Sequence, residues 1–191
     1  VARIDVLINN AGVMACPVEW RTSEGYEYQL GTNHLGHFLF TMLLLDRLQS
    51  AVAPESPARI VNVSSIAHMG GRMCYDDFNL EQHTGFTGRA LAYARSKLAL
   101  IYFTRELARR LANTGHNNSD NNNNARKRVI HTYALHPGIV QTNLLQHCGL
   151  LKWYKRLFNR LLFINVKDGA QTILYCAFDE RAASQTGGFY S

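Results

Sequence analysis

Tyr93 and Lys97 lie four residues apart in a segment with helical periodicity, so their side chains share one face of the predicted helix. A phenol normally keeps its proton up to about pH 10, and a neighbouring ammonium favours the phenolate and lowers that pKa. Such a tyrosine can give a proton to a substrate oxygen, or take one from it, near neutral pH. A surface Tyr beside a surface Lys has the same spacing, so the pair needs other residues to support it.

Ser65 is the second residue suited to this chemistry. It ends an apolar segment, Arg59 to Ser65, that reads as a buried strand, and from there its hydroxyl can hold a substrate carbonyl oxygen. Because side chains alternate along a strand, Ser64 should point to the opposite side, so only one of the two serines is expected to act in catalysis. The plain alternative is an ordinary serine in a turn at a strand end.

Asn33 is the third candidate, in the middle of a predicted helix. An internal Asn is mildly unfavourable there, and Gly36 nearby costs about 1 kcal/mol relative to Ala. The two together indicate a backbone distortion or a buried water site. A solvated Asn beside a closely packed Gly is the alternative.

The elements that would position these residues alternate between strand and helix, and the strands are apolar on both faces. That pattern predicts an α/β fold with a doubly wound parallel sheet. Polar or glycine clusters follow three strands and should meet in one crevice beyond their carboxyl ends. The predicted strands are Ile4 to Ile8, Arg59 to Ser65 and Val129 to Leu135, with a last one starting at Gly187; the helices span about Thr22 to Gln49, Arg89 to Asn113 and Asp168 to Phe178; the clusters are 9–12, 64–65 and 137–138.

Composition narrows the class of protein. The 191 residues suit a single domain, and the net charge of +6 is local, because 121–167 holds eight basic residues and no acidic one. A nucleic-acid footprint is therefore not indicated. The four cysteines form no Cys-x-x-Cys pair, and the scattered histidines lack further ligands, so we expect reduced thiols and no metal site. No segment is long and apolar enough to span a bilayer, and we expect an intracellular protein.

Five motifs, taken together in order and spacing, resemble those of the short-chain dehydrogenase/reductase family, and the retinol-dehydrogenase-like branch fits best. The resemblance covers nearly the whole chain and implies a Rossmann-type domain over 1–191 that interconverts an alcohol and an aldehyde or ketone on a lipophilic, retinoid-like substrate. The motifs are Asn9 to Gly12, Asn33 to Phe38, Arg59 to Ser65, Tyr93 to Lys97 and His136 to Thr142.

The resemblance also implies catalytic roles. Tyr93 would be the acid/base, and Lys97 would lower its proton affinity and bind the nicotinamide ribose. Ser65 would orient the substrate oxygen, and Asn33 would hold a water that links Lys97 to solvent. Further cofactor contacts would come from Asn9, Ala11 and Gly12 on the adenosine side and from Pro137, Gly138, Val140 and Thr142 around the nicotinamide.

The sequence departs from the family pattern at its start. The family opens with a glycine-rich turn that receives the pyrophosphate at a helix N-terminus, and the residues before Ile4 hold no such turn. The first βαβ units of the fold are therefore expected to be lacking. We expect the 191 residues alone to be poorly soluble and to bind nicotinamide cofactor weakly. The branch favours NADP over NAD, although the residues that choose between them are not in this chain.

Two segments carry separate expectations. Residues 115–125 are almost all Asn and are expected to form a disordered loop. Residues 150–162 alternate apolar and basic side chains, which predicts an amphipathic flap over the substrate pocket. The same pattern suits contact with an anionic membrane surface, such as that of the endoplasmic reticulum. The two long helices suggest a homodimer contact.

Two other functions stay open on the sequence. One is a non-catalytic Rossmann-type binding or scaffold protein, which usually goes with loss of the tyrosine or the lysine, whereas Tyr93 and Lys97 are both present. The other is a fragment with no activity of its own, which the missing glycine-rich turn and the Asn-rich run allow.

Overall fold

The computed structural model describes residues 2–52, 57–117, 130–140 and 164–191. Its sheet has four parallel strands in the order β1-β2-β3-β4, so each strand pairs with its neighbour in sequence. The predicted parallel sheet is confirmed. The strands are β1 (Val6–Asn9), β2 (Ala58–Val63), β3 (Ile130–Leu135) and β4 (Phe189–Tyr190).

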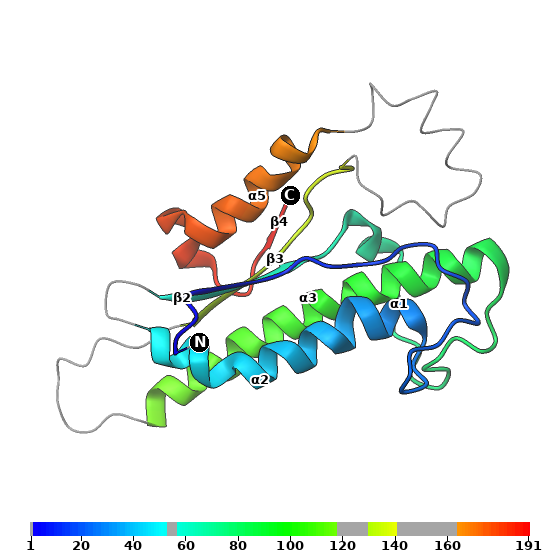
Figure 1. The fold of residues 1–191 in the computed structure, drawn as a ribbon, viewed down its shortest axis with the longest axis horizontal. Coiled ribbons are helices and arrows are strands. Elements are labelled where there is room, and N and C mark those ends of the chain that lie inside the picture. Colours follow the sequence, from blue (N-terminus) through cyan, green and yellow to red (C-terminus); the bar gives the residue numbers. More distant parts are fainter. Residues whose placement is uncertain (1, 53–56, 118–129, 141–163) are drawn as a thin grey trace.

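Helices cover both faces of this sheet, as Figure 1 shows. On one face lie α2 (Gly36–Ala51) and α3 (Gly85–Asn117), and on the other lies α5 (Val166–Phe178). The alternation of side chains along β2 serves both layers: Ile60 packs with Leu48 and Phe103, whereas Val61 packs with Cys176. All six residues of β2 are buried, in keeping with a sequence that is apolar at four of its six positions.

The first helical region begins later than predicted, at Tyr28 instead of Thr22. The buried carboxylate of Glu27 accepts hydrogen bonds of 2.8 Å from the backbone N–H groups of Gln29 and Leu30, which caps the short helix α1 (Tyr28–Leu30). Glu27 is therefore a buried helix cap and not a surface residue.

Asn33 lies in a π-helical turn, η1 (Gly31–Leu35), between α1 and α2. This confirms the predicted backbone distortion. π-helical turns inside α-helices are rare and occur often at functional sites.

The apolar stripe of α2 does not face the sheet. Phe38, Leu39 and Met42 are each more than 40% exposed, and the helix buries His37, Thr41 and Leu48 instead. Leu43 of α2 and Tyr102 of α3 are also exposed, and these five apolar side chains are called here the α2–α3 face.

The remaining elements are short. They are the 3-10 helices η2 (Ile66–Gly70), directly after β2, and η4 (Glu180–Gln185), after α5.

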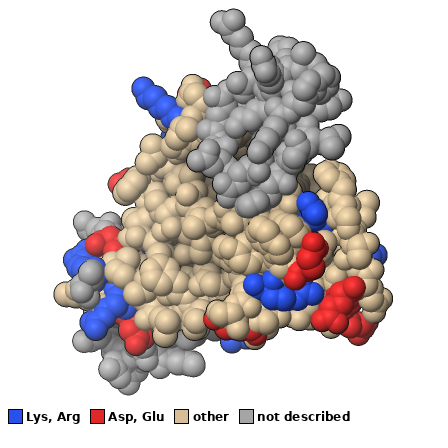
Figure 2. All heavy atoms as spheres, turned by 45° about the vertical axis from the view of Figure 1, so that its right-hand side comes forward, with Lys and Arg blue, Asp and Glu red and all other residues tan. Residues whose placement is uncertain are grey.

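On the side of the molecule in Figure 2, the described Lys, Arg, Asp and Glu side chains lie interspersed around a broad uncharged area. No continuous basic track crosses the described part of that side.

Candidate active site

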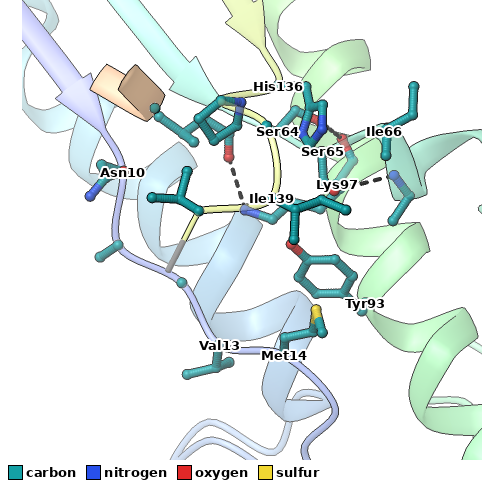
Figure 3. A pocket seen from close by; sticks show the side chains of 18 of the residues that line it. Asn10, Val13, Met14, Ser64, Ser65, Ile66, Tyr93, Lys97, His136 and Ile139 are labelled. Atoms are coloured by element: carbon teal, nitrogen blue, oxygen red, sulfur yellow. Dashed lines mark hydrogen bonds between the residues drawn. The ribbon is translucent and has the colours of Figure 1, made fainter. Parts of the chain in front are cut away.

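A pocket of about 990 Å³ lies beyond the carboxyl ends of the strands, where the sequence placed the crevice. Its walls come from the segment after β1, the segment after β2, one face of α3 and the segment after β3 (Figure 3). Tyr93, Lys97 and Ser65 all line it. The structure thus brings Ser65 to the same pocket as the Tyr93–Lys97 pair, which lies 28 or more positions later in the chain.

Both the side chain and the backbone of Lys97 are hydrogen-bonded at the end of β2. Its ammonium donates a 2.8 Å hydrogen bond to the carbonyl of Val63, and its own carbonyl accepts a 2.7 Å bond from the hydroxyl of Ser64. The side chain is 3% exposed, and this burial lowers the pKa of Lys97 to about 8. Its ammonium nitrogen lies 5.7 Å from the centre of the Tyr93 ring.

The two serines differ as the strand alternation predicts. The hydroxyl of Ser64 is turned to the backbone of α3, whereas Ser65 lies at the start of η2, where its oxygen accepts a bond from the N–H of Ala67. No described acceptor takes the hydroxyl hydrogen of Ser65, which is therefore available to an oxygen in the pocket. Tyr93 lies on the α3 wall, within the same view (Figure 3).

Asn33 lies behind the pocket wall and does not line it. Its side-chain oxygen accepts from the N–H of Val13, and its side-chain nitrogen donates to the carbonyl of Val13 and to the hydroxyl of Ser96. Its backbone carbonyl is 2.9 Å from Nδ1 of His37. A carbonyl only accepts, so this His37 nitrogen carries the hydrogen. The π-helical turn therefore clamps the segment after β1 to α3.

Most, but not all, of the residues that the resemblance assigns to cofactor binding line the pocket. Ala11, Gly12, Pro137, Gly138 and Val140 line the pocket. Asn9 does not: its amide is buried and donates to Thr41 and Asn62 inside the fold, and Thr142 lies outside the described residues.

Gly12 fits this position by size. A Cβ there would lie 3.1 Å from Oδ1 of Asn33, a tight contact that would press on the clamp, and 3.5 Å from Nζ of Lys97, an ordinary contact distance.

Sequence reasoning missed one charged residue of the pocket, Arg89. It precedes Tyr93 by four residues, as Tyr93 precedes Lys97, so the same i, i+4 spacing that singled out the pair also places Arg89 on that face of α3. His136, at the end of β3, also lines the pocket; burial and the neighbouring His68 lower its pKa.

The described part of the chain contains no group of three His, Cys, Asp or Glu residues placed to hold a metal ion. None of its helices is long and apolar enough to cross a membrane.

Known proteins are similar to this chain in sequence. The family profile of short chain dehydrogenases matches residues 1–76. Retinol dehydrogenase 12 of Homo sapiens is 43% identical over 189 residues, which are 99% of this chain and 52% of that protein. The chain thus spans about half the length of the curated relatives it matches.

Solved structures show the same fold. A crystal structure of an uncharacterized protein from Mycobacterium paratuberculosis has a TM-score of 0.64 and 38% identity, over 93% of this chain and 51% of that one. NADPH-bound carbonyl reductase from chicken fatty liver has a TM-score of 0.62 and 25% identity, over 98% of this chain and 63% of that one. The Rossmann-type sheet, the ordered motifs and these relatives agree: the chain belongs to the short-chain dehydrogenase/reductase family and is similar to its retinol dehydrogenases.

Proposed function

We propose that the chain carries the catalytic half of an NAD(P)-dependent oxidoreductase that interconverts an alcohol and an aldehyde or ketone. The observation that carries the proposal is the meeting of Tyr93, Lys97 and Ser65 in one pocket beyond the strand ends. The similarity to retinol dehydrogenases supports the same reading.

The pocket suits a nicotinamide cofactor. An ammonium has three N–H donors, and Lys97 gives one of them to Val63, so two stay unused among the described residues. Such donors can bind ribose hydroxyls. Ala11 and Gly12 would hold the adenosine side, and Pro137, Gly138 and Val140 the nicotinamide side, with Thr142 beyond them. A bound nicotinamide would give a hydride to the substrate carbon or accept one from it.

The chain's own residues would handle the proton. In reduction, the Tyr93 phenol donates its proton to the substrate oxygen, while the Ser65 hydroxyl donates a hydrogen bond to the same oxygen. The Lys97 ammonium stabilises the resulting phenolate. Asn33 keeps the segment after β1 against α3 and so holds Gly12 beside Lys97. We also propose that Asn33 holds a water that links Lys97 to solvent, which gives the proton a route back to the pair.

The direct test is an assay of the purified full-length protein with NADPH and NADH against apolar aldehydes and ketones, followed by loss of reduced-nicotinamide absorbance. We expect turnover, with NADPH preferred. Cofactor binding without turnover of any carbonyl or alcohol would favour a non-catalytic binding protein instead.

The rate should depend on pH through the Tyr93–Lys97 pair. Reduction needs both groups protonated, so kcat/KM should fall about tenfold for each pH unit above an apparent pKa near 8, the value to which burial lowers the pKa of Lys97. Oxidation needs the pair with one proton removed, so its kcat/KM should rise with pH over the same range. The apparent pKa belongs to the pair and not to either residue. Reduction that stays constant up to pH 10 would contradict this assignment.

The substrate is proposed to be lipophilic and retinoid-like. Ile66, Phe86, Ile139 and Ile173 give the pocket a largely apolar wall. Met14 adds a flexible apolar side chain that adapts to different shapes.

A homodimer through the α2–α3 face is our proposal for the uncovered apolar side chains. Exposed apolar surface of this extent usually marks an interaction site. Leu43, 71% exposed, is the natural place for a charge. We expect Leu43→Glu to shift the full-length protein from dimer to monomer in light scattering, whereas Leu174→Glu, an exposed leucine of α5, should leave the mass unchanged. A wild-type protein that is monomeric at every concentration would rule the contact out.

Residues 150–162 lie outside the described residues, as do 118–125 of the Asn-rich run, so these expectations stay as predictions. Residues 115–117, expected to belong to that loop, instead form the end of α3. From their sequence we propose that 150–162 act as a flap and rest on an anionic membrane, such as that of the endoplasmic reticulum, from which a lipophilic substrate would enter.

A further inference from the structure

Arg89 is the charged residue of the pocket that the reaction above does not use. It lies on α3, four residues before Tyr93, and both residues line the pocket with Phe86, Ala90 and Lys97 on one face of the helix. The rise of an α-helix places Arg89 about one turn, roughly 6 Å, from Tyr93 along the axis. Helical side chains lean toward the N-terminus, so both side chains lean the same way and their bases stay about one turn apart.

The guanidinium of Arg89 has no protein partner among the described residues. Its Nε is buried and makes no hydrogen bond, and no described carboxylate forms an ion pair with it. Its backbone is fixed, because its carbonyl accepts a 3.1 Å bond from the side chain of Gln29. The next arginine of α3, Arg95, is by contrast paired with Glu27.

The pocket supplies no counter-charge either. Arg89 and Lys97 are charged residues of its described wall, and that wall contains no Asp or Glu. The segment 141–163, whose structure is not described, also has no acidic residue in its sequence. A half-buried arginine beside an apolar wall is costly without an anionic partner.

We propose that Arg89 binds the carboxylate of an apolar oxo- or hydroxy-acid whose reacting oxygen lies at Tyr93. A planar guanidinium matches a carboxylate with two parallel hydrogen bonds, and such charge-assisted bonds are strong. The substrate class is then an anionic lipophilic molecule with its carboxylate about one helical turn or more from the carbonyl carbon. This inference rests on the proposed function for the position of the reacting oxygen.

The test compares ω-oxo carboxylates of increasing chain length with their methyl esters in the full-length protein. We expect kcat/KM to favour the acid over its ester by about 10- to 100-fold, which corresponds to the usual contribution of a charge-assisted hydrogen bond. Arg89→Gln should abolish that preference, and Arg89→Lys should restore part of it. Arg105→Gln, an exposed arginine farther along α3, is the matched control and should behave as wild type.

A binding measurement separates this inference from the proposed function. Calorimetry of a saturated long-chain carboxylate, with the protein free of cofactor, should show binding that Arg89→Gln weakens by a similar factor. Arg89-dependent binding without turnover of any aldehyde would sustain the carboxylate site and reject the proposed reaction. Equal rates for acid and ester in wild type and variant would overturn the carboxylate site and leave the reaction intact. A phosphate monoester of the same chain that outperforms the carboxylate would also overturn the choice of carboxylate.

Discussion

Replacement of Tyr93 by phenylalanine is expected to lower kcat by about 10²- to 10⁴-fold, the usual contribution of a positioned general acid or base. The change removes one hydroxyl and keeps the ring, which is 7% exposed and packed on the α3 wall. Lys97 would stay in place, because its two hydrogen bonds run to Val63 and Ser64 and not to the phenol. Steady-state assays should therefore show lost turnover with an almost unchanged dissociation constant for the cofactor.

Tyr102→Phe is the matched control, since this tyrosine lies on the same helix and is 49% exposed. It should retain full activity. If Tyr93→Phe kept wild-type turnover, the acid/base would have to be a different group, and the pH profile of the variant would show whether the limb near pH 8 persists.

The second large effect concerns stability. Arg95→Met should lower the free energy of unfolding by about 3–5 kcal/mol, as removing one partner of a buried ion pair does. The side chain of Arg95 is 1% exposed; its Nη2 lies 3.5 Å from the Glu27 carboxylate, and its Nη1 donates a 2.7 Å bond to the carbonyl of Phe78. Methionine fills the space but leaves that carboxylate and that carbonyl without the guanidinium.

Denaturation by urea, followed by circular dichroism, measures the loss. Arg109→Met serves as the control, because the ion pair of Arg109 with Glu106 is on the surface of the same helix, and it should leave the midpoint nearly unchanged. A midpoint for Arg95→Met equal to that of the wild type would mean that the pair contributes nothing net. The change should also loosen the joint between α1, α3 and the segment at Phe78, since Arg95 touches all three.

The sequence predicted the parallel sheet and the edge of it at which the pocket lies, for a physical reason. The strands of a parallel sheet are buried on both faces, so β2 and β3 are predominantly apolar in sequence, and the carboxyl ends of such strands indicate where a ligand site lies. The i, i+4 spacing of Tyr93 and Lys97 and the unfavourable Asn33 and Gly36 were equally local signals. Each could be read without knowing any tertiary contact.

What the sequence did not reveal depends on partners distant in the chain. Glu27 reads as a surface acid, yet it caps α1 and pairs with Arg95, 68 positions away. The apolar residues Phe38, Leu39 and Met42 of α2 suggest a core-facing side, but they are exposed, and the buried side of α2 carries His37 and Thr41. Arg89 carries no local sign that it lacks a partner, because that fact depends on what surrounds it in space.

The double attachment of Lys97 to β2 bears on how the molecule comes apart. Local unfolding can displace a lysine on a loop from its site well before the whole protein unfolds. Here the ammonium of Lys97 is bonded to Val63, the last residue of the fully buried strand β2, and its carbonyl to Ser64, the next residue; buried core strands are among the parts of a fold that open last. On heating, the loss of activity and the unfolding of the sheet should therefore occur at the same temperature, with no folded but inactive intermediate.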